Sequence, residues 1–299
     1  MNILVTGANG FLGKSIFEEY SSESFVCTLA RSSGDYRICL ENDTPVFDHK
    51  FDLVVHAAGK AHSVPKSESQ KKEFYDINVT GTQNLLTGIE RVGLPKEFVF
   101  ISSVAVYGKS KGVNIDEKTV LNAKDAYGLS KIEAEVLVLD WCQKNNVVGT
   151  ILRLPLLIGE NPPGNLGAMI RAINKGYYFD IAGGKAKKSM VLISDVSKFI
   201  KTAASMGGIF NLTDGYHPSF KEISHTLANN HNKRMPFNMP YSIAKVLGLL
   251  GDILGDRFPV NSDKISKITS DLTFDDSKAR KEVGWDPQPI LAFVKNKKI

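Results

Sequence analysis

A glycine-rich turn directly after the first predicted strand constrains this chain more than any other feature. The apolar run Asn2 to Thr6 is typical of a buried strand, and glycines follow it at the spacing Gly-x-x-Gly-x-x-Gly, at Gly7, Gly10 and Gly13. Such glycines allow a tight turn and let the next helix pack closely on the strand, while free N–H groups at the start of that helix attract an anion. The turn therefore predicts a site for the pyrophosphate of a dinucleotide.

The first half of the chain alternates short β-branched runs with longer amphipathic segments. The helical patterns cover Glu73 to Ile89 and Tyr127 to Cys142. The predicted strands are Asn2 to Thr6, Phe25 to Ala30, Leu53 to Ala57, Phe98 to Ser102 and Val147 to Leu154. Because this alternation is typical of βαβ units, we expect an α/β fold: a Rossmann-type, doubly wound parallel sheet with a smaller, mostly helical C-terminal lobe.

A turn-rich segment from Gly159 to Gly164 ends the alternation and marks the expected passage into the second lobe. We expect residues 1–160 to form a dinucleotide-binding domain and residues 161–299 a substrate-binding lobe, with residues 195–215 returning to the first domain. Beyond the turn, helical patterns cover 165–174, 195–205, 219–230 and 241–254, and a short strand pattern covers 209–212.

Composition and charge exclude several other classes of protein. The chain has 37 Lys and Arg against 32 Asp and Glu, a net charge of +5 that suits a phosphate-bearing ligand and is small for a nucleic-acid partner. Its three cysteines have no spacing typical of a metal site, so we expect no metal and a reducing, cytoplasmic location. The N-terminus lacks the pattern of a signal peptide, and Lys245 and Asp252 interrupt the most apolar later stretch, so we expect no integral membrane helix.

The residues after the second predicted strand indicate which dinucleotide binds. An NAD-selective site places an acidic side chain there for the ribose 2′-hydroxyl, whereas this strand is followed by Arg31, Ser32 and Ser33. A guanidinium and hydroxyls suit a 2′-phosphate better, because arginine offers charged, paired donors. We therefore expect NADP(H) as the cofactor. NAD(H) is the alternative, because Asp35 lies close enough in sequence to fold back toward the site.

A tyrosine and a lysine one helical turn apart, Tyr127 and Lys131, are candidates for proton transfer. A phenol has a pKa of about 10, and one ammonium at about 4 Å, at an effective dielectric constant of about 20, supplies about 4 kcal/mol, which is enough to lower that pKa to near neutrality. Ser103 follows a predicted strand at the sheet edge where ligands bind, and its hydroxyl can hold a carbonyl oxygen while Tyr127 transfers the proton. An incidental tyrosine and lysine on a surface helix are the alternative. We expect His56 to be a packed histidine and not a catalyst.

Together these segments closely resemble the extended short-chain dehydrogenase/reductase family, in its NAD-dependent epimerase/dehydratase group acting on nucleotide sugars. The resemblance covers nearly the whole chain and implies that Ser103, Tyr127 and Lys131 form the catalytic set and that Arg153 lines the nicotinamide pocket. The implied cofactor contacts are Gly7, Asn9, Gly10, Phe11, Leu12, Gly13, Arg31, Ala57, Ala58, Gly59, Asn78, Tyr127, Lys131 and Pro155. The implied substrate contacts are Ser103, Val104, Asn165, Leu166 and Lys188.

Two reactions remain open within that family. Related sugar 4,6-dehydratases carry an Asp-Glu pair directly after the catalytic Ser or Thr, whereas Ser103 is followed by Val104 and Ala105. Arg31 favours a 4-keto reductase that uses NADPH to reduce a UDP-4-keto-6-deoxy-N-acetylhexosamine in bacterial polysaccharide biosynthesis. The alternative is a UDP-sugar 4-epimerase, similar to UDP-glucose 4-epimerases, with tightly bound NAD. A non-catalytic NADP-binding sensor or scaffold is a hypothesis from another class, and the complete catalytic set argues against it.

Two further expectations concern binding partners of the chain. The family resemblance implies a homodimer. The apolar helical pattern from Tyr241 to Leu254 would rest on a membrane surface if the substrate were lipid-linked. The interpretation that the sequence favours is a lobe helix that covers the substrate pocket or a protein interface.

Overall fold

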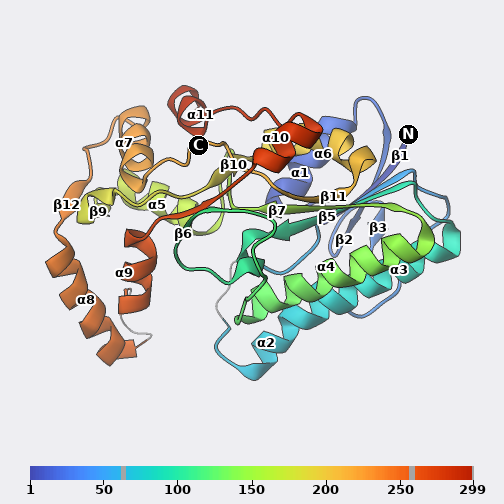
Figure 1. Cartoon of the computed structure of the whole chain (residues 1–299), viewed down its shortest axis with the longest axis horizontal. Helices are drawn as coiled ribbons and strands as arrows, with labels where there is room; N and C mark the ends of the chain where they lie inside the picture. The colour runs from blue at the N-terminus through green and yellow to red at the C-terminus, as the bar shows by residue number, and fades with distance from the viewer. Residues whose placement is uncertain (62–64, 256–259, 298–299) are drawn as a thin grey trace.

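A seven-stranded parallel sheet forms the centre of the molecule (Figure 1). The computed structural model describes residues 1–61, 65–255 and 260–297. The strands are β1 (Asn2–Thr6), β2 (Phe25–Ala30), β3 (Tyr36–Arg37), β4 (Leu53–His56), β5 (Glu97–Ser103), β7 (Val148–Leu154) and β11 (Gly208–Asn211). They lie in the order β11-β7-β5-β4-β1-β2-β3, and every neighbouring pair is parallel. The chain reverses its direction across the sheet between β1 and β4, which confirms the predicted doubly wound fold.

Helices cover both faces of this sheet. One face carries α1 (Phe11–Tyr20), α6 (Ile193–Met206) and α10 (Ser277–Val283), and the other carries α2 (Glu68–Tyr75), α3 (Gly81–Val92) and α4 (Ala126–Asn145) (Figure 1). Each face has its own apolar core, and β4 between them is buried along its whole length. Because both faces are covered, the strands read as continuous apolar runs in the sequence.

The predicted helix from Glu73 to Ile89 is interrupted in the structure. A single π-helical turn, η1 (Asp76–Thr80), separates α2 from α3. Asn78 in this turn is buried, and the Thr82 hydroxyl donates a 2.6 Å hydrogen bond to the Asn78 carbonyl oxygen. A π-turn holds one residue more than an α-helical turn, so apolar periodicity does not reveal it.

The lobe beyond the sheet combines helices with short pairs of parallel strands. The described pairs are β8 (Leu156–Ile158) with β10 (Met190–Leu192), β9 (Phe179–Ile181) with β12 (Phe237–Met239), and β6 (Gly112–Ile115) with β13 (Leu272–Phe274). The helices are α5 (Gly164–Asn174), α7 (Phe220–Asn230), α8 (Tyr241–Leu254), α9 (Ser262–Thr269) and α11 (Ile290–Asn296). Strands this short show no alternation in the sequence, so none of these three pairs was predicted.

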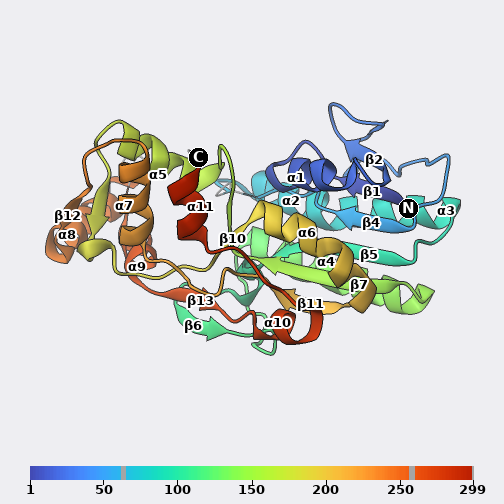
Figure 2. The same ribbon diagram turned by 90° about the horizontal axis from the view of Figure 1, so that it is seen from above.

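Segments from the second half of the chain return to the sheet. α6 packs against α1, and β11 pairs with β7. α10 and the following Trp285 form a second return (Figure 2). The Trp285 ring lies 4.8 Å from the Phe199 ring, and its Nε1 donates to the Thr213 carbonyl oxygen. The expected division into residues 1–160 and 161–299, with one return at 195–215, did not include this second return.

Candidate active site

The turn after β1 requires glycine at two positions. Gly7 has a φ of +69°, and a Cβ there would lie 2.7 Å from the Ala58 backbone nitrogen. A Cβ on Gly13 would lie 2.1 Å from the Gly7 carbonyl oxygen, so α1 can pack on the turn only because both residues lack side chains. Gly10 caps α1 without a side-chain hydrogen bond, which leaves the N–H groups of the first helical turn available to an anion.

A cavity of about 290 Å³ opens beside this turn. Its lining includes seven of the predicted cofactor residues: Gly7, Asn9, Gly10, Arg31, Ala57, Ala58 and Gly59. Ile38, Leu40, Glu41 and Ile77 also line it, and no motif in the sequence had indicated them. A glycine cradle and an uncapped helix start, beside a cavity with both apolar and polar lining residues, fit the pyrophosphate and nucleoside of a dinucleotide.

The wall at the end of β2 carries the groups that bear on the choice between NADP and NAD. Arg31 lines the cavity, and Asn9 donates a 2.9 Å hydrogen bond to the Ser33 hydroxyl, which ties this segment to the glycine turn. Asp35 folds back onto β2 instead. Its carboxylate accepts 2.8 Å hydrogen bonds from the N–H and the hydroxyl of Thr28, and these bonds lower its pKa. Glu41, on another segment, is the acidic residue in the cavity lining.

Ser103 and Tyr127 meet at the carboxyl edge of the sheet. Ser103 is the last residue of β5, and Tyr127 lies in the first turn of α4, where the Asp125 carboxylate caps the helix by accepting from the Gly128 N–H at 3.0 Å. Burial raises the pKa of Tyr127, and a hydrogen bond with Ser103 lowers it by a smaller amount. The prediction that Lys131 brings this pKa to near neutrality is wrong for the protein groups alone, because burial outweighs every other influence on the phenol.

Lys131 lies one turn further along α4 and is buried. Its ammonium donates a 2.9 Å hydrogen bond to the Ile101 carbonyl oxygen and lies 4.5 Å from the centre of the Phe100 ring. Burial lowers the pKa of Lys131 to about 8, against a smaller opposing effect of Glu135. A cation with so low a pKa can lose or regain its proton close to neutral pH.

Asn78 connects the segment after β4 to α4, the helix that carries Tyr127 and Lys131. Its side-chain oxygen accepts a 2.7 Å hydrogen bond from the Lys60 N–H, and its Nδ2 donates to the Ser130 hydroxyl at 2.8 Å. Ser130 in turn donates to the Tyr127 carbonyl oxygen at 2.8 Å. A Cβ on Gly59 would lie 2.9 Å from Asn78 Oδ1, so the segment passes close against this amide. The contribution of Ser130 was not foreseen, because a serine inside a helix carries no signal of its own.

His56 is a packed histidine, as expected, and its hydrogen bonds link Thr6 of β1 to Thr82 of α3. The Thr82 hydroxyl donates to Asn78, so it accepts from His56 Nε2 at 2.9 Å, and Nδ1 accepts from the Thr6 hydroxyl at 2.6 Å. Thr6 also accepts from the Ala58 N–H at 3.1 Å. Burial, with a smaller effect of Lys131, lowers the pKa of His56 to about 3, so the ring is neutral in this relay.

Arg153, which was expected at the wall of the nicotinamide pocket, lies in the core instead. Its guanidinium forms a 2.7 Å ion pair with Glu135, and both side chains are 3% exposed. Tyr107 accepts a further hydrogen bond from it at 3.1 Å, and Ser102 donates to the same carboxylate. The arginine therefore joins β7 to α4 through a buried network.

The remaining predicted residues belong to other elements of the sheet edge and to the lobe. Phe11 and Leu12 belong to the first turn of α1, and Pro155 and Val104 directly follow β7 and β5. In the lobe, Leu166 is buried in the apolar core, while its neighbour Asn165 is exposed. Lys188 donates a 2.9 Å hydrogen bond to the Lys267 carbonyl oxygen in α9. The structure thus brings Ser103, Asn78, Tyr127 and Lys131 together and places the expected sugar-nucleotide contacts in the lobe.

The chain is similar to proteins of known family. The model of the NAD dependent epimerase/dehydratase family matches residues 3–213. An Escherichia coli O157:H7 protein named N-acetyl-alpha-D-glucosaminyl-diphospho-ditrans,octacis-undecaprenol 4-epimerase is 28% identical, over 93% of this chain and 88% of its own length. A Vibrio cholerae UDP-glucose 4-epimerase is 27% identical, over 97% of this chain and 92% of its own length.

A solved structure supports the fold. The structure of RMD from Pseudomonas aeruginosa complexed with NADPH matches with a TM-score of 0.74 and 19% sequence identity, over 99% of this chain and 97% of that chain. At this identity the likeness concerns the fold alone. It agrees with the parallel sheet and the flanking helices described above.

Proposed function

The chain belongs to the NAD dependent epimerase/dehydratase family, whose members are extended short-chain dehydrogenases/reductases, and we propose that it transfers a hydride at C4 of a nucleotide-diphosphate sugar. The observation that carries this proposal is the placement of Ser103 at the end of β5, where its hydroxyl opposes the rise that burial causes in the pKa of the Tyr127 phenol, with Lys131 one turn along the same helix as Tyr127. The pair lies at the sheet edge where the fold binds its ligands. The lobe, with Asn165 and Lys188, would hold the sugar nucleotide.

The protein side chains account for the movement of the proton. A nicotinamide cofactor supplies or accepts the hydride when it is bound. In the direction of reduction, Tyr127 gives its phenolic proton to the carbonyl oxygen at C4, and in the direction of oxidation it takes the proton from the C4 hydroxyl. Ser103 holds the same oxygen beside the phenol by a hydrogen bond. The Lys131 ammonium favours the phenolate that is left after the proton has moved.

We favour a 4-keto reductase that uses NADP(H), with a UDP-4-keto-6-deoxy-N-acetylhexosamine as the substrate. Arg31 lines the cavity beside the glycine turn. The Asp35 carboxylate instead accepts hydrogen bonds from Thr28. A guanidinium without a competing carboxylate after β2 suits the 2′-phosphate of NADPH. A reductase uses its cofactor once and releases it, so it needs an open, exchangeable site.

A UDP-sugar 4-epimerase is the second candidate. Relatives named as 4-epimerases align over more than nine-tenths of this chain, and Glu41 in the cavity lining offers a carboxylate to a ribose hydroxyl of NAD. An epimerase would oxidise C4, let the keto sugar turn over and return the hydride to the other face, with NAD retained throughout. Because the Escherichia coli relative is named for a sugar on undecaprenyl diphosphate, a lipid-linked sugar belongs among the substrates to be tried.

The cofactor distinguishes the two candidates. The purified protein is denatured, any released dinucleotide is identified by chromatography, and the affinities of the cofactor-free protein for NADPH and NADH are compared. The reductase predicts little retained cofactor and tighter binding of NADPH. Tightly retained NAD without a preference for NADPH would contradict it and support the epimerase, which should then interconvert UDP-N-acetylglucosamine and UDP-N-acetylgalactosamine.

A further inference from the structure

α8 presents its large apolar side chains away from the protein. Its buried residues are small, Ala244, Gly248 and Gly251, and they share the side of the helix that packs on α9. A Cβ on Gly248 would lie 3.2 Å from the Ser262 backbone, so the two helices are in close contact. The α8 apolar face, on the opposite side, consists of residues that are 44 to 81% exposed: Ile243, Val246, Leu249, Leu250, Ile253 and Leu254. An amphipathic helix normally buries such a face.

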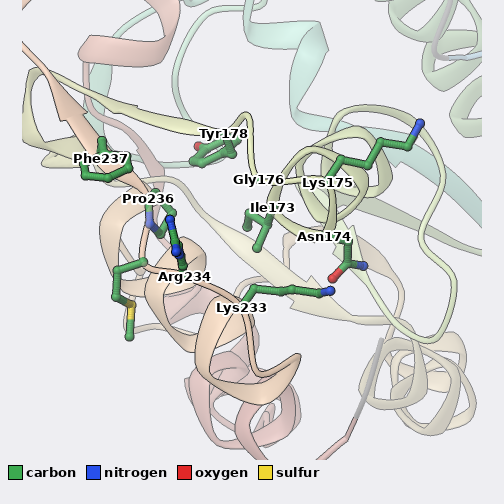
Figure 3. A pocket seen from close by; sticks show the side chains of 10 residues that line it. Ile173, Asn174, Lys175, Gly176, Tyr178, Lys233, Arg234, Pro236 and Phe237 are labelled. Carbon is green, nitrogen blue, oxygen red and sulfur yellow. The ribbon is translucent and has the colours of Figure 1, made fainter.

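Cationic side chains lie on α8 and beside the start of β12, the strand that precedes α8. Lys233 and Arg234 lie shortly before α8 and line a cavity of about 260 Å³. Figure 3 shows Arg234 on one side of this cavity and Lys175, from the end of α5, on the other. Within the described parts of the chain, none of these three side chains forms an ion pair. Lys245 adds an exposed cation on α8 itself. This end of the lobe therefore carries these four cations, one of them on α8.

We propose that the α8 apolar face docks on the surface of a membrane that contains acidic phospholipids. The apolar side chains would enter the boundary between headgroups and acyl chains, and Lys245 on α8, with the cations beside β12, would attract the anionic headgroups. α8 has 14 residues, and among the described helices none is long and apolar enough to cross a membrane, so the helix would lie along the surface. This inference goes beyond the proposed reaction and does not depend on it.

Charge favours a membrane over a second copy of the chain as the occupant. A twofold contact through α8 would bring Lys233, Arg234 and Lys245 toward their own copies. The acidic residue of α8, Asp252, is directed to α9, where it accepts a 3.0 Å hydrogen bond from the Ser262 N–H. Anionic headgroups would neutralise the cations instead. Figures 1 and 2 show α8 at the end of the molecule opposite β1 and β2, so docking would leave the glycine turn accessible.

Vesicle flotation without any substrate tests this proposal. The full chain is mixed with vesicles of phosphatidylethanolamine and phosphatidylglycerol, or with vesicles of phosphatidylcholine alone. We expect it to float with the acidic vesicles, less so at high salt, and to stay in the soluble fraction with phosphatidylcholine. The variant Leu250→Asp/Ile253→Asp should reduce partitioning by about tenfold or more. Val120→Asp, at an exposed apolar residue between β6 and α4, should float like the wild type.

Two charge-reversal variants distinguish a specific contact with the headgroups from a general attraction of the positively charged protein to acidic vesicles. Lys233→Glu/Arg234→Glu should weaken flotation, whereas Lys198→Glu/Lys201→Glu, on the exposed side of α6, should not. A wild-type chain that stays in the soluble fraction at low salt, or α8 variants that float as well as the wild type, would overturn the proposal. A wild-type dimer in light scattering that Leu250→Asp converts to a monomer would overturn it in favour of a second copy. Turnover of soluble UDP-sugars should be unchanged in the α8 variants, so failure of one proposal leaves the other standing.

Discussion

Lys131 is held where an ammonium group is costly to keep. The side chain is buried, and its polar contacts are the Ile101 carbonyl oxygen and the face of the Phe100 ring. The burial that raises the pKa of Tyr127 lowers that of Lys131. At the scale of single residues, burial disfavours the charged form of both side chains, so the phenol of the proposed catalytic pair keeps its proton until substrate and cofactor stabilise the phenolate.

The pKa of Lys131 makes stability depend on pH. It is about 8 in the folded protein and about 10.4 in the unfolded chain. Between these values the unfolded chain binds more protons, so the free energy of unfolding should rise with pH across this window. Relative to Lys131→Met, which has no group to titrate, the wild type should gain about 3 kcal/mol from about pH 7 to about pH 11 in urea unfolding. Parallel curves for the two proteins would show that the lysine is not buried as described.

Arg31 decides the cofactor preference in this account. Arg31→Asp removes a charged donor for the 2′-phosphate and introduces a repelling carboxylate, so the affinity for NADPH should fall about 10- to 100-fold, while that for NADH holds or improves. Fluorescence titration with both cofactors measures the change. Arg37→Asp, on the exposed edge strand β3 and outside the cavity lining, is the matched control. An equal loss for both cofactors would mean that Arg31 does not read the 2′-phosphate.

At the scale of elements, the sequence predicted the strands and helices that have a periodic apolar pattern, and it did not predict the π-turn or the buried ion pair of Arg153. The predicted strand over residues 25–30 matches β2, and the helical pattern from Tyr127 lies within α4, because buried strands and amphipathic helices leave long periodic signals. The π-turn that positions Asn78 leaves no such signal. Arg153 was misplaced for a related reason: its partner Glu135 lies in another element, and only packing shows that the pair is buried.

The contact between α1 and the glycine turn gives a sharp test at this scale. Gly13→Ala would place a methyl group 2.1 Å from the Gly7 carbonyl oxygen. Because backbone must move to relieve this contact, the free energy of unfolding should fall by about 1 to 3 kcal/mol, and the affinity for NADPH should fall with it. Urea unfolding and cofactor titration measure the two effects. Glu18→Ala, on the exposed side of the same helix, should change neither, and a Gly13→Ala protein that binds NADPH normally would contradict the described turn.

At the scale of the whole molecule, the chain passes repeatedly between sheet and lobe. β6 pairs with β13, which lies more than 150 residues later, and Trp285 packs beside α6. Contacts between such distant segments depend on the folded chain and not on local patterns, so the sequence indicated the first return at residues 195–215 and not the second. The substrate residues share this difficulty, because the lobe is assembled from several separate segments. A homodimer, implied by the family resemblance, stays a prediction that light scattering can check.

The most direct test of the central claim is the turnover of Tyr127→Phe. The substitution removes the proton donor and keeps the ring, so turnover of the UDP-sugar that the wild type accepts should fall by at least about 100-fold, while the affinity for the cofactor stays within about twofold. Product chromatography and cofactor titration measure the two quantities, and Tyr75→Phe, at an exposed tyrosine, is the control. Turnover near the wild-type rate in Tyr127→Phe would contradict the account.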